Sequence, residues 1–171
     1  MDFFSEWIVK REKNVIDILK VIGIWLGVFL LFFIIINNYQ FFRSFIIIAF
    51  AAVVYIAYKL LMNMNVEYEY IVTNSILDID KIIARKKRKR ICSIDVGNFD
   101  FFALANGEYG KNIQNPSVRK KINAWSGKAD ANPYYALFNY NGERTCLIFE
   151  PNEKMVDNFA QYISREKYHK F

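Results

Sequence analysis

Residues 15–36 read VIDILKVIGIWLGVFLLFFIII, and residues 41–64 read FFRSFIIIAFAAVVYIAYKLLMNM. The first stretch ends in sixteen uncharged residues, and the second holds fifteen between Arg43 and Lys59. A helix needs about 20 apolar residues to span a bilayer, so the flanking cations, including Lys20, must extend toward the headgroups. A chain this small cannot surround such helices with protein. The two stretches therefore predict transmembrane helices at 15–36 and 41–62.

The connection between the two predicted helices is short and polar, consisting of Asn37, Asn38, Tyr39 and Gln40. So short a link forces an antiparallel hairpin over 15–64. Basic residues flank the ends of the helices that lie away from this connection. Before the first helix and at its start these are Lys10, Arg11, Lys13 and Lys20. The connection side carries only Arg43. The positive-inside bias then predicts an integral plasma-membrane protein with both termini in the cytoplasm.

Residues 1–14 place Phe3, Phe4, Trp7 and Ile8 at helical spacing before the basic residues. This pattern predicts an interfacial amphipathic segment, either a short helix among the headgroups or an extension of the first transmembrane helix.

Gly23 and Gly27 form a GxxxG pattern, which lets helices approach closely. It admits three interpretations: packing against small residues of the second helix, homodimerisation, or chance. The small residues available on the second helix are Ser44, Ala49, Ala52 and Ala57.

After Asn65 the hydrophobic period changes from helical to two, which is typical of strands. We predict strands in 66–73 and 76–83, joined by a turn at Asn74-Ser75, then a third in the run KKRKRICSIDV. A further hairpin turns at Asn141-Gly142, and an amphipathic helix follows at 152–168 with Asn152 as its N-cap. The pattern over 98–132 is weak. It suggests short strands in FDFFAL and KKINAWSG around a polar loop, GEYGKNIQNPSVR.

Six or seven short antiparallel strands followed by one helix are the layout of a pleckstrin-homology-like (PH-like) barrel. The stretch VEYEYIVTNSILDIDKIIARKKRKRICSIDV, residues 66–96, resembles the start of bacterial PH-like domains, and residues 134–167 resemble their end more loosely. The whole arrangement is similar to an uncharacterised family of small bacterial proteins with two transmembrane helices. The resemblance implies an α+β PH-like domain over 66–171, an antiparallel β-barrel or roll with a C-terminal helix, on the cytoplasmic side.

One departure from this family pattern concerns lipid recognition. Lipid-binding PH domains usually gather basic residues around the first hairpin turn, and residues 73–76 contain none. A phosphoinositide pocket is therefore not implied.

The strongest local feature is a run of six cations: Arg85, Lys86, Lys87, Arg88, Lys89 and Arg90. One interpretation is a cross-strand charge ladder with Glu67, Glu69, Asp78 and Asp80. A second is contact with anionic lipid headgroups or with a partner. A third is nucleic-acid binding, with bases stacked on Phe99, Phe101, Phe102 or Trp125.

Nothing in the sequence indicates catalysis. It has no Gly-rich phosphate loop, no HExxH or GxSxG motif and no metal-binding cysteine spacing, so no catalytic residue, cofactor or metal is expected. We expect His169 to lie in a solvated tail, and Cys92 and Cys146 to be buried, reduced thiols.

The leading functional hypothesis is a membrane-anchored, non-enzymatic PH-like module that binds an unknown protein partner or acts as a scaffold, with its basic strand against anionic lipid. The alternatives are a small oligomeric channel or transporter subunit and a membrane-tethered nucleic-acid-binding domain. Neither helix offers the polar stripe that a pore would need. In the channel alternative, Gly23 and Gly27 would drive oligomerisation, and a homodimer is one possible partner arrangement.

Overall fold

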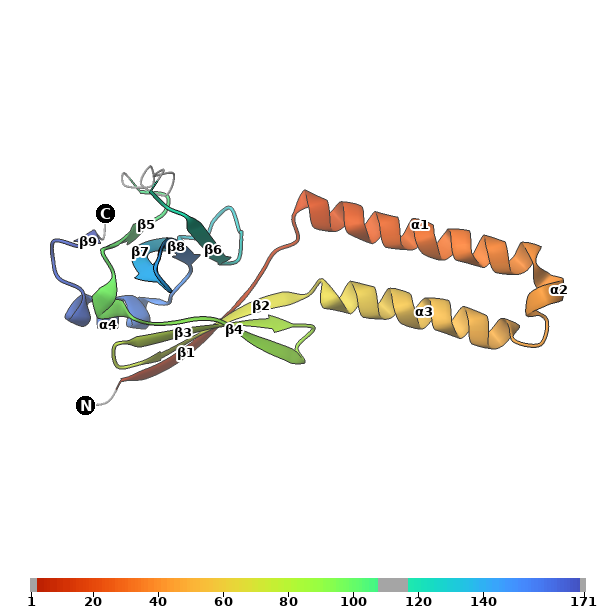
Figure 1. The fold of residues 1–171 in the computed structure, drawn as a ribbon, viewed down its shortest axis with the longest axis horizontal. Coiled ribbons are helices and arrows are strands. Elements are labelled where there is room, and N and C mark those ends of the chain that lie inside the picture. Colours follow the sequence, from red (N-terminus) through yellow and green to blue (C-terminus); the bar gives the residue numbers. More distant parts are fainter. Residues whose placement is uncertain (1–2, 108–116, 170–171) are drawn as a thin grey trace. The chain divides into compact units, whose positions relative to one another are not determined.

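The structure is a computed structural model that describes residues 3–107 and 117–169 (Figure 1). The chain forms two compact units. One is helical and comprises Lys13–Val66 with Ile83–Lys86, and the other is β-rich and contains the remaining segments. Most of the predicted polar loop, residues 108–116, lies outside the described residues.

The helical unit contains α1 (Val15–Asn37), α2 (Tyr39–Phe42) and α3 (Ile46–Asn63). The backbone N–H of Asn14 donates to the Asp17 carboxylate at 3.1 Å, which caps the start of α1. By length and composition α1 and α3 are both able to cross a membrane. At 1.5 Å per residue they are about 35 and 27 Å long, against about 30 Å of hydrocarbon.

The second predicted helix begins later than expected. The prediction of a helix from residue 41 was wrong, because the chain reverses direction through α2 and a turn at 43–45 before α3 begins. The N–H of Phe45 donates to the carbonyl of Phe42 at 2.8 Å within this turn. Phe32 of α1 and Phe50 of α3 then meet edge to face, with ring centroids 4.9 Å apart.

The N-terminal segment is a strand, and the prediction of an interfacial helix over 1–14 was wrong. β1 (Phe4–Lys10) pairs antiparallel with β2 (Val66–Thr73), from Phe4 opposite Thr73 to Lys10 opposite Glu67. The helical spacing of the aromatic residues is outweighed by a complete set of backbone partners on β2. The β-rich unit therefore begins before the helices, rather than at residue 66.

β1 and β2 belong to a four-stranded sheet of order β1-β2-β3-β4, completed by β3 (Ile76–Ile83) and β4 (Lys87–Asp95). The predicted turn at Asn74-Ser75 is confirmed, and Asn74 has the positive φ angle of 55° that such turns require. Tyr68, Tyr70 and Val72 alternate along β2 and are all buried.

The second sheet has five strands in the order β6-β8-β7-β5-β9. Its members are β5 (Phe101–Leu104), β6 (Lys120–Ala124), β7 (Tyr134–Tyr140), β8 (Glu143–Phe149) and β9 (Tyr168–His169). The turn at Asn141-Gly142 is confirmed by φ angles of 51° and 81°. The expectation of purely antiparallel strands was wrong, because β6 pairs parallel with β8 and β9 pairs parallel with β5. A short 3-10 helix, Val96–Asn98, precedes β5.

The C-terminal helix α4 (Glu153–Tyr162) is shorter than the predicted 152–168. Asn152 caps it as predicted, because its side chain accepts from the Met155 N–H at 2.9 Å. The helix ends at Tyr162 because the chain turns back to add β9 to the second sheet. His169 is accordingly not in a solvated tail: it is half-buried and stacks on Phe101, with centroids 4.7 Å apart.

Tyr70 joins the two sheets at the centre of the β-rich unit. Its ring packs edge to face on Phe149, its hydroxyl donates to the carbonyl of Ala124, and the N–H of Glu150 donates to that hydroxyl at 3.2 Å. The side chain is fully buried, and this burial raises the pKa of the phenol well above its usual value. A single hydroxyl therefore satisfies a buried backbone carbonyl and a partly buried backbone N–H.

Tyr70→Phe is expected to lower the free energy of unfolding of the full chain in detergent by about 1–3 kcal/mol, because it removes the hydrogen bonds that the hydroxyl makes to both backbone groups. Denaturant unfolding followed by tryptophan fluorescence measures the change. Tyr162→Phe, at a largely exposed position, is the matched control. An equal, small effect in both variants would contradict the structural role given to Tyr70.

Candidate functional site

The candidate site is the first half of β4 and the turn before it, which carry the predicted run of cations. The turn places Ala84 and Arg85 at φ angles of 55° and 56°, and the Lys86 N–H donates to the Ile83 carbonyl at 3.1 Å. Two successive positive φ angles define a type I′ turn, in which Asn and Gly are favoured. A residue other than glycine that is held at a positive φ angle has a strained backbone conformation. The chain thus places a cation at a strained turn.

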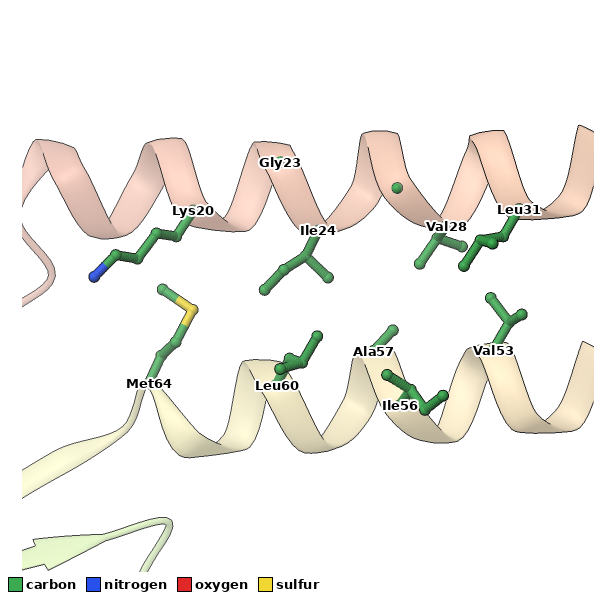
Figure 2. Close-up of a pocket in the computed structure, with 11 residues that line it drawn as sticks. Lys20, Gly23, Ile24, Val28, Leu31, Val53, Ile56, Ala57, Leu60 and Met64 are labelled. Carbon is green, nitrogen blue, oxygen red and sulfur yellow. The ribbon is translucent and has the colours of Figure 1, made fainter.

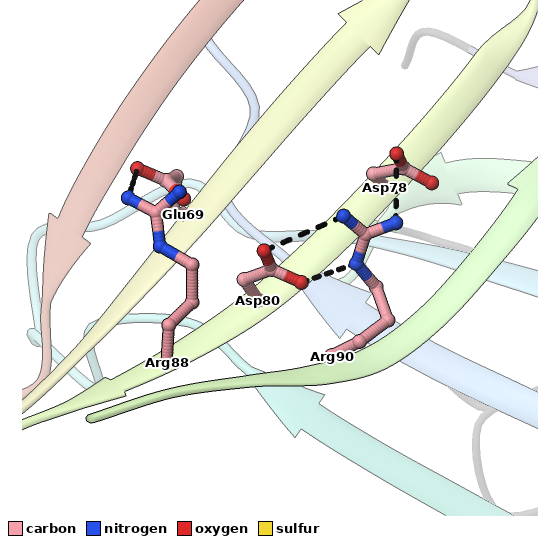
Figure 3. A network of polar contacts seen from close by, with 5 residues as sticks. All are labelled: Glu69, Asp78, Asp80, Arg88 and Arg90. Atoms are coloured by element: carbon pink, nitrogen blue, oxygen red, sulfur yellow. Dashed lines mark hydrogen bonds and ion pairs between the residues drawn. The ribbon is translucent and has the colours of Figure 1, made fainter.

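Arg88 binds a buried carboxylate on β2 (Figure 3). Its Nη2 lies 2.8 Å from Oε1 of Glu69, whose side chain is only 1% exposed. A carboxylate this buried requires a cationic partner, because an isolated charge out of water is strongly unfavourable. Arg88 is therefore engaged in an ion pair within the fold.

Arg90 holds two carboxylates of β3 (Figure 3). Its Nη1 lies 2.8 Å from Oδ2 of Asp78, its Nε donates to Oδ1 of Asp80, and its Nη2 lies 3.5 Å from Oδ2 of Asp80. These contacts raise the pKa of Arg90 above its usual value, with the hydrogen bond to Asp80 as the main cause. The planar guanidinium suits this fork, and a lysine would not reproduce it.

The predicted charge ladder is thus confirmed for Arg88 and Arg90 with Glu69, Asp78 and Asp80. Glu67 lies opposite Lys10 of β1 in the strand pairing. The lysines of the run differ from these two arginines in their contacts. Within residues 3–107 and 117–169, Lys86, Lys87 and Lys89 are exposed and form no ion pair. The run therefore contains two arginines, Arg88 and Arg90, that link strands of the sheet, and three lysines that face solvent.

Glu69 has an unusual electrostatic environment. Its burial is the main cause that raises its pKa; the charge of Arg88 opposes this, while a hydrogen bond with Glu6 and the charges of Glu6 and Asp80 add to it. Oε2 of Glu69 finds no donor among the described residues. Glu6 is also a carboxyl group, so the contact becomes a hydrogen bond only when one of the two carries a proton.

Glu69→Gln is expected to change the pH dependence of stability. The raised pKa means that the fold binds this proton more tightly than the unfolded chain does, so wild-type stability falls as pH rises from the usual glutamate pKa through the raised one. Glutamine does not titrate. The stability of Glu69→Gln relative to wild type should therefore increase between about pH 4 and about pH 7.

Thermal unfolding of the full chain in detergent at both pH values tests this expectation. Glu153→Gln, on the exposed surface of α4, is the matched control. The same pH trend in both variants would contradict the role of burial at Glu69.

The two cysteines and two of the aromatic residues considered in the sequence lie in the core. Cys92 and Cys146 are free and fully buried, as expected, and burial raises their pKa values to about 12 and about 11, which keeps both as unreactive thiols. Of the four aromatic residues considered for base stacking, Phe99 and Phe102 are fully buried and stack on other core rings. They offer no surface to a base.

The interpretation of Gly23 and Gly27 as points of close packing against the second helix was wrong. A Cβ atom added to either glycine would meet no atom within 4 Å. The glycines instead line an apolar groove between α1 and α3, to which Ala57 contributes but Ser44, Ala49 and Ala52 do not. The sequence pattern indicated that these two positions are special, but it did not indicate that the space beside them is left open.

The β-rich unit also has a polar hollow of about 440 Å³ at the start of α4 that sequence reasoning missed, lined by Asn132, Tyr134, Pro151, Glu153, Val156 and Asp157. Burial, then the charges of Asp157 and Glu153, raise the pKa of Tyr134. Among the described parts of the chain, no group of three or more His, Cys, Asp or Glu residues could hold a metal ion.

The chain thus combines two β-sheets and a C-terminal helix with a pair of apolar helices that is inserted between β1 and β2. A family model described as "Bacterial PH-like domain (DUF6106)" matches residues 1–169, and the chain belongs to this family. The resemblance seen in the sequence is thereby confirmed. The match includes β1 and both apolar helices, so the family comprises the whole arrangement. No curated protein and no solved structure matches the chain. PH-like domains are in general binding modules without catalytic activity.

Proposed function

We propose that this chain is a membrane-anchored, non-enzymatic PH-like module that stands at the cytoplasmic face of the cell membrane and binds a protein partner there. Lys86, Lys87 and Lys89 orient it by contact with anionic lipid headgroups. The observation that carries the proposal is the position of the helical hairpin, which is inserted between two paired strands, β1 and β2.

This insertion constrains the topology. The chain leaves the first sheet after Lys10 and returns to it at Val66, and Lys10 lies opposite Glu67 in the sheet. If α1 and α3 span the bilayer, both open ends of the hairpin must emerge on the side that holds this sheet. The linker between β1 and α1 has four residues, 11–14, and reaches at most about 14 Å. The β-rich unit is therefore tethered close to the membrane surface.

The basic flanks favour the cytoplasmic side. Lys10, Arg11, Lys13 and Lys20 surround the start of α1, whereas the connection side of the hairpin carries Arg43 alone. This is the charge distribution of a hairpin whose open end lies inside the cell.

A specific phosphoinositide pocket is not part of the proposal. The turn between β2 and β3 carries no cation, and the polar groups of Asn74 form hydrogen bonds within the fold. Its N–H donates to the Phe3 carbonyl at 2.8 Å, its side-chain oxygen accepts from the Phe3 N–H at 2.9 Å, and its carbonyl accepts from Asn158 at 2.7 Å. These contacts leave the fold free for two other uses: general attraction to an anionic surface and recognition of a protein partner.

Labelling of single cysteines in intact cells tests the orientation. Cys92 and Cys146 are fully buried and serve as a silent background. A membrane-impermeant maleimide should label Asn38→Cys in the connection without permeabilisation, and Ser93→Cys on β4 only after it. The reverse pattern would place the β-rich unit outside the cell.

Charge reversal of Lys86, Lys87 and Lys89 to glutamate tests the lipid contact. In vesicles containing the full chain, energy transfer from a dye at Ser93→Cys to labelled headgroups should be stronger with phosphatidylglycerol than with phosphatidylcholine alone. Each lysine near an anionic surface contributes on the order of 1 kcal/mol, so the triple variant should lose this difference. Added salt should reduce it in the wild type.

The matched control reverses Lys121, Lys128 and Lys154, which are exposed elsewhere on the β-rich unit and give the same change in net charge. Equal loss in both triple variants would assign the effect to net charge alone. No dependence on lipid charge in the wild type would refute the proposed contact.

A further inference from the structure

The helical unit contains a groove of about 510 Å³ between α1 and α3 (Figure 2). Its size lies within the range of about 300–1,000 Å³ that is typical of sites for small molecules. Its lining is apolar except at one end, where Lys20 stands. The lining residues are Lys20, Gly23, Ile24, Gly27, Val28 and Leu31 on α1, and Val53, Ile56, Ala57, Leu60 and Met64 on or just after α3.

Two glycines create part of this space. Gly23 and Gly27 lie one helical turn apart and so share a face of α1. A Cβ at either position would meet no atom within 4 Å, so the space beside them is unfilled by α3. Just beyond the groove the helices are in contact, where Phe32 meets Phe50. The hairpin is thus closed near its connection and open toward Lys20.

The length of the groove matches one leaflet of a bilayer. From Lys20 to Leu31 is eleven residues, or about 17 Å of helix. Half of the hydrocarbon thickness of a membrane is about 15 Å. A helix from a second copy would run along the whole of α1, whereas an acyl chain ends at the middle of the bilayer. The groove therefore fits an acyl chain better than it fits a helix.

The charge at the mouth of the groove indicates the headgroup. Lys20 is the only charged residue in the lining, and its side chain is 64% exposed. Its contact with Asp17 is long, at 3.9 Å, and an exposed pair of this kind contributes little. Asp17 itself is engaged with the Asn14 N–H. The Lys20 ammonium is thus available to a phosphate at the membrane surface.

We propose that the groove binds one acyl chain of an anionic phospholipid, with its phosphate paired to Lys20. The inference rests on the proposed function, because it requires α1 and α3 to span the membrane. The bound lipid belongs to the leaflet on the side of the β-rich unit, since Lys20 lies at the end of α1 that leads from β1.

The test uses the full chain in vesicles with trace amounts of spin-labelled phosphatidylglycerol or phosphatidylcholine. Electron paramagnetic resonance measures the fraction of each lipid that the protein immobilises. Wild type should hold phosphatidylglycerol in preference to phosphatidylcholine. Gly27→Leu fills the groove and should reduce retention of both lipids, whereas Ala52→Leu adds an isobutyl side chain outside the groove and should leave retention unchanged.

Lys20→Gln should reduce the preference for phosphatidylglycerol roughly fivefold, because the lost cation attracts a lipid with net negative charge more strongly than it attracts the zwitterionic phosphatidylcholine, and no groove volume changes. Lys13→Gln, which removes a cation outside the groove, is the matched control.

Two outcomes overturn the inference alone: a chain that resists alkaline extraction from the vesicles but immobilises no lipid, or one that crosslinks as a dimer that Gly27→Leu abolishes. The second would assign the groove to another copy of the chain. A chain that alkaline extraction releases would overturn the proposed membrane anchoring as well, so the two failures are distinguishable.

Discussion

The pairing of β1 with β2 is the constraint on which the rest of the structure depends. Seven residues before the helical hairpin form a continuous antiparallel ladder with the strand that follows it. Without β1, the edge of β2 would present unpaired backbone groups to solvent. With it, the hairpin becomes an insertion within one sheet. Both of its open ends are held by the same β-rich unit, and the family match over residues 1–169 covers the whole arrangement.

The first sheet shows how a run of like charges can be accommodated in a fold. Arg88 and Arg90 form ion pairs with Glu69, Asp78 and Asp80, which the neighbouring strands place close to them (Figure 3). The lysines between and before them make no such contacts within the described residues. Arginine supplies the forked geometry that buried carboxylates need, whereas lysine suits a diffuse anionic surface. The two residue types thus divide structural and proposed binding roles within one short segment.

Both proposed lipid contacts would act at the same membrane surface. Lys20 lies near the end of α1 that leads from β1, and Lys87 and Lys89 belong to the sheet that contains β1. A lipid held between the helices and a basic strand against the headgroups would require anionic lipid in one leaflet. Lys20 belongs to the helical unit, as does Lys86, whereas Lys87 and Lys89 belong to the β-rich unit. Each contact can therefore be removed without changing the other.

Local features of this protein followed from sequence alone. The two apolar helices, the turns at Asn74 and Asn141-Gly142, the cap at Asn152 and the pairing of Arg88 and Arg90 with acidic neighbours all depend on residues close in the chain or on adjacent strands. The tertiary structure decided what depends on distant partners. β1 was mistaken for a helix because its partner strand lies beyond the hairpin, and the parallel strands and the place of His169 have the same cause. The groove beside Gly23 and Gly27 also required the structure, because the absence of a side chain does not reveal whether a neighbouring helix fills the space.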